Sequence, residues 1–232
     1  MPGRLTDDAK DRRTPSRPRR RRPAGHGPVV GFDLDMTLVD SAAGIVATVV
    51  AACAEQGVVV DAEEVRRGIG IPLEQALATV APTLDPVATA NRYRELYPAH
   101  GVPPTVLLPG AAEAVEAVHA LGGRVLVVST KVERAVHAVL AHVGLDRGRR
   151  APDLVVGGLF AAAKGVRLAA EQADVYVGDH PGDVEAAQVA RATSVAVATG
   201  PHGVADLTAA GADVVLPDLT TVPAWLAAFA RP

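Results

Sequence analysis

Short β-branched runs alternate with alanine-rich stretches along most of this 232-residue chain. The alternation predicts an α/β fold, with parallel strands joined by helices that cover both faces of the sheet. Only 3% of the residues are aromatic, so the core must consist mainly of Val, Ala and Leu, which suits such a sheet. The expected strands are Val29–Asp33, Arg124–Val128, Leu154–Val156, Val175–Val177, Ser194–Val197 and Asp213–Leu216. The expected helices that follow them are 111–121, 132–143, 164–172, 183–191, 204–210 and 223–230.

The long interval between the first and second expected strands breaks this rhythm. Its residues have helical character throughout, and prolines mark the joints between helices. The pattern predicts a helical domain, residues 42–104, inserted into a core formed by residues 29–41 and 105–232. The expected helices of the insert are 42–56, 61–67, 72–80 and 86–98.

The charge is uneven, because residues 1–28 carry nine basic and three acidic residues and very few apolar ones. We expect a disordered, solvated tail rather than a nucleic-acid-binding arm. The most apolar stretch, Ala42–Ala54, is shorter than the roughly 20 residues that span a bilayer. The single cysteine, Cys53, excludes an internal disulfide and is expected to be a buried apolar residue. The expectation is a cytoplasmic protein, monomeric or homodimeric.

Polar side chains follow several expected strands. In open parallel sheets, ligands bind beyond the carboxyl ends of the strands. Because those ends meet at one edge of the sheet, we expect four carboxylates, a hydroxyl pair and a lysine to converge there. These residues are Asp33 and Asp35, Ser129 and Thr130, Lys164 at the start of a helix, and Asp179 and Asp183.

Four carboxylates in one cleft repel each other and cannot all stay ionised unaided. A bound cation relieves the repulsion, and oxygen ligands favour a hard ion such as Mg²⁺. Lys164 would add a fixed positive charge beside that ion. A magnesium ion with a lysine and a hydroxyl nearby makes a site for a phosphate dianion.

No Ser–His or Cys–His pair is evident, so a carboxylate is the expected nucleophile. Asp33 would attack phosphorus and form an aspartyl-phosphate. Asp35 would donate a proton to the leaving alcohol and then activate water. Asp179 would bind Mg²⁺, and Asp183 would support the ion directly or through water.

The stretch FDLDMTLVDS (Phe32–Ser41), the later VVST, a lysine and VGDHPGDV resemble the four motifs of the haloacid dehalogenase-like phosphohydrolases, in the same order. The chain is most similar to the phosphoglycolate phosphatase-like branch, which has a helical cap after the first motif. The resemblance implies a Rossmann-like core with an inserted cap. It also implies a Mg²⁺-dependent phosphatase that acts on a small phosphorylated metabolite.

The resemblance also implies a role for each motif residue. Asp33 is the nucleophile, Asp35 the acid and base, and Ser129 and Lys164 bind phosphate. The implied Mg²⁺ ligands are Asp33, Asp179, Asp183 and the backbone carbonyl of Asp35. We prefer Ser129 to Thr130 because Ser129 directly follows the strand.

The chain departs from the family pattern in two places. Met36 occupies a position that is usually glycine, and the third motif, FAAAKGVRL, lacks the prolines that often flank its lysine. Thr37 is expected to hold Asp35 by a side-chain hydrogen bond. In the insert, Gly70 is the expected specificity residue, whereas the charged residues of 91–97 are expected to form a solvated helical face.

Other functions in the same superfamily stay open. Asp35 argues against a dehalogenase, because a departing halide needs no proton. No lysine occurs in residues 42–104, which argues against members that form a Schiff base with a cap lysine. The alternatives are a sugar-phosphate mutase, a nucleotidase, or a non-catalytic binding protein on the same fold. Phosphoglycolate is the leading candidate substrate.

Overall fold

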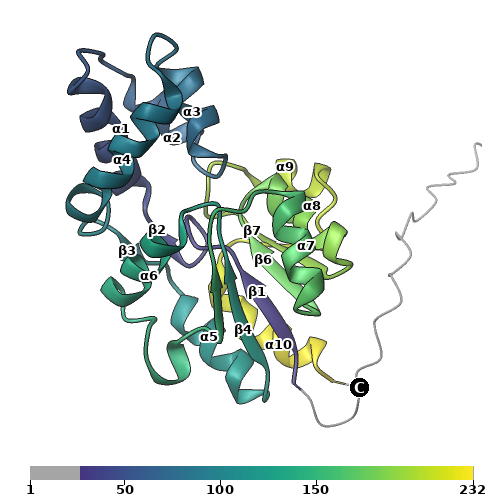
Figure 1. Cartoon of the computed structure of the whole chain (residues 1–232). Helices are drawn as coiled ribbons and strands as arrows, with labels where there is room; N and C mark the ends of the chain where they lie inside the picture. Colours follow the sequence, from purple (N-terminus) through teal and green to yellow (C-terminus); the bar gives the residue numbers. More distant parts are fainter. Residues whose placement is uncertain (1–26, 232) are drawn as a thin grey trace, which may run out of the picture.

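The computed structural model describes residues 27–231, and its centre is a six-stranded parallel sheet (Figure 1). The order of the strands across the sheet is β5-β4-β1-β6-β7-β8, which confirms the expected fold class. The order reverses at β1, because β4 and β6 lie on its two sides. The strands are β1 (Val29–Phe32), β4 (Arg124–Val128), β5 (Leu154–Val156), β6 (Val175–Gly178), β7 (Thr193–Val197) and β8 (Val214–Leu216).

Helices cover both faces of the sheet, as side-chain alternation along the strands requires. Val30 and Phe32 of β1 belong to the larger hydrophobic cluster, together with residues of α5, α6 and α10. Val29 belongs to the second cluster, on the face that α7 and α8 cover. The helices are α5 (Ala111–Ala120), α6 (Glu133–His142), α7 (Ala162–Ala170), α8 (Pro181–Ala190), α9 (Val204–Ala209) and α10 (Val222–Phe229).

Four of the helices between β1 and β4 form a group of their own beside the carboxyl edge of the sheet (Figure 1). We call residues 42–104 the helical insert. Two short antiparallel strands, β2 (Val39–Asp40) and β3 (Val106–Leu107), pair where the chain leaves the core and where it returns. The helices of the insert are α1 (Ala42–Ala54), α2 (Ala62–Arg67), α3 (Leu73–Val80) and α4 (Pro86–His100).

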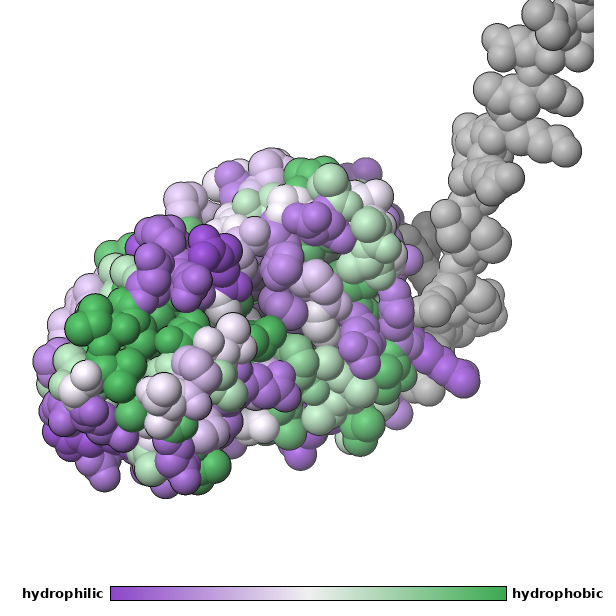
Figure 2. Space-filling model, turned by 90° about the horizontal axis from the view of Figure 1, so that it is seen from above, coloured by the Kyte–Doolittle hydropathy of each residue, from purple (hydrophilic) through white to green (hydrophobic). Residues whose placement is uncertain are grey.

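Local sequence explains where the insert helices begin. The side chain of Asp61 accepts hydrogen bonds from two backbone N–H groups at the start of α2, and Asp85 does the same for α4. The packed interior of the insert includes Val49 and Cys53 of α1 and Tyr97 of α4, so the expected burial of Cys53 is confirmed. Viewed from above, the surface of the molecule mixes hydrophilic residues with apolar patches, one of which lies on the side of the insert (Figure 2).

The structure corrects several details of the sequence-based prediction. The strands β2 and β3 were not expected. Helix α4 continues past Pro98 to His100, because a proline in the last turn removes only one backbone hydrogen bond. Helix α7 begins at Ala162, so Lys164 lies within its first turn and does not open it.

The remaining predictions concern the basic segment 1–28 and the apolar helix α1. Most of the basic segment 1–28 lies outside the described residues. Gly27 and Pro28 are described, and the carbonyl oxygen of Pro28 accepts a hydrogen bond of 2.9 Å from the backbone N–H of Arg124. Among the described helices, α1 included, none has the length and apolar character needed to cross a membrane.

Candidate active site

Three parallel strands deliver polar residues to the same point, because β4, β1 and β6 are neighbours and end at one edge. Asp33 follows β1, Ser129 follows β4, and Asp179 follows β6. All three residues are at least 95% buried. Their meeting point is where the strand order reverses, the position at which open parallel sheets bind ligands.

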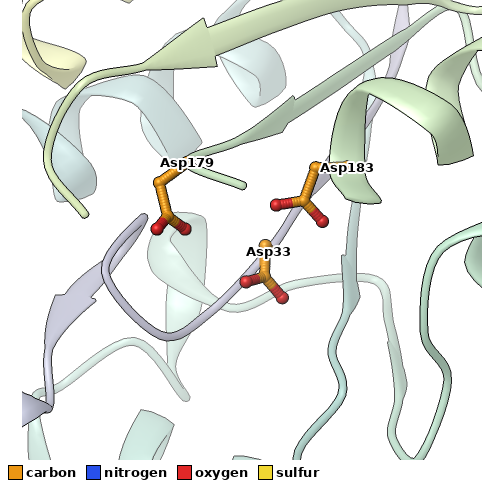
Figure 3. Close-up of side chains that lie close together, drawn as sticks. All are labelled: Asp33, Asp179 and Asp183. Atoms are coloured by element: carbon orange, nitrogen blue, oxygen red, sulfur yellow. The ribbon is translucent and has the colours of Figure 1, made fainter. Parts of the chain in front are cut away.

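Asp33, Asp179 and Asp183 form a compact carboxylate cluster. One carboxylate oxygen from each residue lies within 4.8 Å of the others, and all three residues are buried. Figure 3 shows the carboxylates pointing toward one another from the end of β1, the end of β6 and the first turn of α8. The structure therefore brings together three of the four aspartates that the sequence placed at this edge.

Lys164 lies against this cluster. Its Nζ donates hydrogen bonds to Asp33 Oδ1 at 2.9 Å and to Asp183 Oδ1 at 2.8 Å. Burial alone would lower the pKa of Lys164, but the carboxylates of Asp183 and Asp33 raise it well above its usual value. The lysine is therefore a permanently charged, buried counter-ion for two members of the carboxylate cluster.

One ammonium group does not balance three buried carboxylates. Burial raises the pKa of Asp33 to about 7, and Lys164 only partly opposes this effect. Burial, together with the charges of Asp183 and Asp33, also raises the pKa of Asp179 well above its usual value. A divalent cation held by oxygen ligands would restore the balance, so the cluster fits Mg²⁺ by charge and by donor type.

Asp35 has surroundings different from those of the carboxylate cluster. Ser41 Oγ donates a hydrogen bond of 2.6 Å to Asp35 Oδ1, and Lys131 Nζ lies 3.3 Å from Asp35 Oδ2. The side chain of Lys131 is 8% exposed, and its Nζ lies 4.2 Å from the centre of the Tyr97 ring. The carboxylate of Asp35 is thus held by groups that do not touch the cluster.

Thr37 does not hold Asp35, contrary to the sequence-based expectation. Its hydroxyl donates a hydrogen bond of 2.9 Å to Asp179 Oδ1, a residue 142 positions away. The loop after β1 turns back so that Thr37 faces the end of β6, whereas Ser41 reaches Asp35. Thr37 therefore orients a member of the carboxylate cluster.

Met36 has a left-handed backbone, with φ of 57°. Its backbone N–H donates to the carbonyl oxygen of Val39 at 2.7 Å, which closes the tight loop after β1. Glycine adopts this conformation without strain, whereas other residues do so at a cost of about 1–2 kcal/mol. The positive φ explains why glycine is usual at this position. In this chain a half-buried methionine adopts the same conformation at the cost of backbone strain.

The two candidate phosphate hydroxyls have different contacts. Ser129 is 1% exposed, and its Oγ accepts a hydrogen bond of 3.2 Å from the backbone N–H of Lys131. Thr130 Oγ1 instead lies 3.5 Å from the carbonyl oxygen of Gly70 in the insert. Ser129 therefore belongs to the core side of the site, and Thr130 lies at the contact with the insert.

Gly70 lies where the insert approaches the core. Its φ is +106°, and a Cβ built on it would be 2.8 Å from Cδ2 of His180. His180 caps helix α8, since its Nδ1 accepts from the backbone N–H of Gly182 at 2.9 Å. Asp183 Oδ2 in turn accepts from the His180 N–H at 3.2 Å, so Asp183 caps the helix and also belongs to the cluster.

A cavity of about 470 Å³ lies between the insert and the carboxyl edge of the sheet. Its lining includes Asp33, Asp35 and Ser129 from the core, and Gly70 from the insert. It also includes three residues without an expected site role: Lys131, Tyr93 and Tyr97.

The two tyrosines are buried against the cavity, a placement that the sequence analysis did not predict. The four-residue spacing of Tyr93 and Tyr97 was the available signal, because it puts both rings on one helix face. For Lys131, the only signal was its position directly after the hydroxyl pair.

Comparisons with known proteins agree with this geometry. Residues 30–148 match the model of the family described as haloacid dehalogenase-like hydrolase. The chain is 30% identical over 216 residues to "Probable phosphatase IndB" of Dickeya dadantii, covering 84% of this chain and 91% of that one. It is 31% identical over 188 residues to the phosphoglycolate phosphatase of Cereibacter sphaeroides, covering 70% and 81% of the two chains.

A solved structure shows the same fold. The crystal structure of a predicted phosphatase from Clostridium acetobutylicum superposes with a TM-score of 0.75 at 20% identity, over 88% of this chain and 99% of that one. The family model spans the insert and the part of the core that carries Asp33, Asp35 and Ser129. The chain therefore belongs to the haloacid dehalogenase-like hydrolase family and is a phosphatase of that family.

Proposed function

We propose that the protein is a Mg²⁺-dependent phosphomonoester hydrolase that works through an aspartyl-phosphate intermediate. The observation that carries the proposal is the buried cluster of Asp33, Asp179 and Asp183 with Lys164 between two of its members. Asp33 of the cluster lines a cavity that is large enough for a small phosphorylated metabolite. Bound Mg²⁺ would neutralise the carboxylates and offset the charge of the phosphoryl group.

Each residue has a distinct part in the proposed reaction. A carboxylate oxygen of Asp33 attacks phosphorus, a new P–O bond forms, and the bond to the leaving oxygen breaks. Asp35 gives its proton to that oxygen, so the alcohol leaves neutral. Water then attacks the phosphorus of the aspartyl-phosphate and passes a proton to Asp35, which releases phosphate and restores Asp33. Lys164 and Ser129 bind the phosphoryl oxygens.

The surroundings of Asp35 support its assignment as acid and base. It lies two residues after Asp33 but outside the carboxylate cluster, where Ser41 and Lys131 hold its two oxygens. The carboxyl group of a general acid and base must keep a fixed orientation while its charge changes, and Ser41 and Lys131 hold Asp35 in one orientation. The hydroxyl of Ser41 can also remain bonded when Asp35 is protonated.

We also propose a division of labour between the two parts of the chain. Residues 29–41 and 105–232 form the catalytic core, and residues 42–104 form a cap that selects the leaving group. The mixed lining of the cavity supports this division, because its apolar wall comes largely from the insert and its reactive end from the core. Phosphoglycolate is the first metabolite to test, since one relative carries that name.

The test is the hydrolysis of acetyl phosphate by wild type, Asp33→Asn and Asp35→Asn, each with Mg²⁺ and with EDTA. Asp33→Asn and EDTA should each abolish turnover. Asp35→Asn should accumulate phosphoenzyme in rapid-quench experiments, because the intermediate then lacks a base for its hydrolysis. Asp85→Asn is the matched control. Asparagine caps a helix as well as aspartate does, and Asp85 has no role in the proposed reaction. Undiminished turnover by Asp33→Asn would refute the covalent mechanism.

A further inference from the structure

The cavity has a polar end and an apolar body. The polar end is formed by Asp33, Asp35 and Ser129 of the core. The body is lined by apolar side chains from three helices of the insert and the loop that joins two of them, namely Ile45, Val49, Val65, Ile69, Leu73 and Ala76. A leaving group bound in this body exchanges water for hydrocarbon, which stabilises apolar groups and disfavours charged ones.

Each basic residue that lines the cavity either forms an ion pair with a carboxylate or is exposed to solvent. Lys131 pairs with Asp35, and Arg94 pairs with Glu74, which also lines the cavity. The third basic residue of the lining is Arg134, which is exposed to solvent. Among the described residues that line the cavity, a second anionic group on the substrate would therefore meet no buried cation that lacks a carboxylate partner. A carboxylate placed there would lose its hydration without gaining a counter-ion.

The aromatic residues of α4 extend the apolar wall toward the reactive end. The rings of Tyr93 and Tyr97 lie 5.4 Å apart between centres, and both residues are at least 93% buried. The Tyr97 ring is also covered by the Lys131 ammonium group that pairs with Asp35. The aromatic wall therefore ends at the ion pair of Lys131 with Asp35, the residue proposed to protonate the leaving oxygen.

From these observations we propose that the substrate is a phosphate monoester of an uncharged, largely apolar alcohol, and that the insert binds its hydrocarbon part. The proposal rests on the proposed phosphatase function and narrows its substrate class. It disfavours phosphoglycolate, whose leaving alcohol is short and carries a carboxylate. The insert would select for hydrocarbon because Val49, Val65 and Ile69 form a buried wall.

The first experiment compares normal alkyl phosphates from methyl to hexyl with phosphoglycolate, under saturating Mg²⁺. The intrinsic reactivity of these alkyl esters changes little with chain length, so differences in kcat/KM report binding of the hydrocarbon. We expect kcat/KM to rise about fourfold per added methylene, which corresponds to about 0.8 kcal/mol per buried CH₂. Propyl phosphate should exceed phosphoglycolate, its charged counterpart of similar size.

The second experiment uses two adjacent valines of α1 as a matched pair. Val49 is 3% exposed and lines the cavity, whereas Val50 is 37% exposed and does not. Val49→Thr keeps the shape but adds a hydroxyl to the wall, and should lower the hexyl-to-methyl ratio of kcat/KM about tenfold. Val50→Thr makes the same exchange on the same helix and should leave the ratio unchanged. The ratio does not depend on the fraction of folded enzyme.

Calorimetric titration with alkyl phosphonates, which are not hydrolysed, separates this inference from the proposed function. Affinity that rises with chain length in a protein without turnover would overturn the phosphatase mechanism but support the apolar site. Turnover that is independent of chain length, or fastest for phosphoglycolate, would overturn the apolar site and leave the phosphatase function standing. If the enzyme prefers phosphoglycolate and Arg134→Gln removes that preference, Arg134 binds the substrate carboxylate. That result would also overturn the apolar site. The absence of both turnover and length-dependent binding would overturn both proposals.

Discussion

Replacing Lys164 by methionine should destabilise the metal-free protein strongly. The side chains of Lys164, Asp33 and Asp183 are only 3%, 8% and 4% exposed, so the substitution leaves buried carboxylates without their counter-ion. Removing one partner of a buried ion pair costs about 3–5 kcal/mol. For a chain of this size, each kcal/mol shifts Tm by about 2–4 °C, so Tm should fall by roughly 6–20 °C.

The size of this loss should depend on pH. The pKa of Asp33 is raised to about 7 in the folded protein, so folding favours its protonated form. The stability from this carboxyl group is complete below about pH 4 and is lost as the pH rises through about 7. The Lys164→Met variant should therefore lose most stability at about pH 8 in EDTA, and less at about pH 5.5, where its carboxyl groups can take protons. Adding Mg²⁺ at pH 8 should narrow the difference from wild type.

The assay is thermal unfolding followed by circular dichroism, with and without EDTA, at both pH values. Arg167→Met is a matched control, because it removes a partly exposed ion pair with Glu171 from the same helix. That pair should contribute only about 0.3–0.5 kcal/mol. Equal Tm values for wild type and Lys164→Met in EDTA at pH 8 would refute the counter-ion role. An equal loss at both pH values would refute the electrostatic explanation.

Two further predictions concern the loop after β1. Met36→Gly should be more stable than Met36→Ala by about 0.5–1 kcal/mol in urea unfolding, because both variants lack the long side chain but only glycine tolerates φ of 57° without strain. A more stable alanine variant would contradict this account of the backbone. Thr37→Val should weaken Mg²⁺ binding about 10–100-fold by calorimetry, because it removes the hydrogen bond to Asp179. Thr199→Val, which removes a hydroxyl contact with the Met36 carbonyl oxygen in the same loop, should change Mg²⁺ affinity much less.

The sequence alone determined the sheet and the residues at its carboxyl edge. Strand–helix alternation predicts parallel strands, and parallel strands bring their carboxyl ends to one edge whatever lies between them in the sequence. Asp33, Ser129 and Asp179 are therefore neighbours although they lie far apart in the chain. The insert was also visible, because the same alternation stops between the first and second core strands.

The tertiary structure decided which partner each of these residues has. The sequence-based expectation paired Thr37 with Asp35, whereas the turn of the loop after β1 brings it to Asp179. The pairing of Lys131 with Asp35 and its contact with Tyr97 depend on how the insert lies over the core. A periodic pattern shows which residues share a face, but the element that the face meets is determined by long-range packing. For that reason the sequence predicted the reactive end of the cavity, and only the fold revealed its apolar wall.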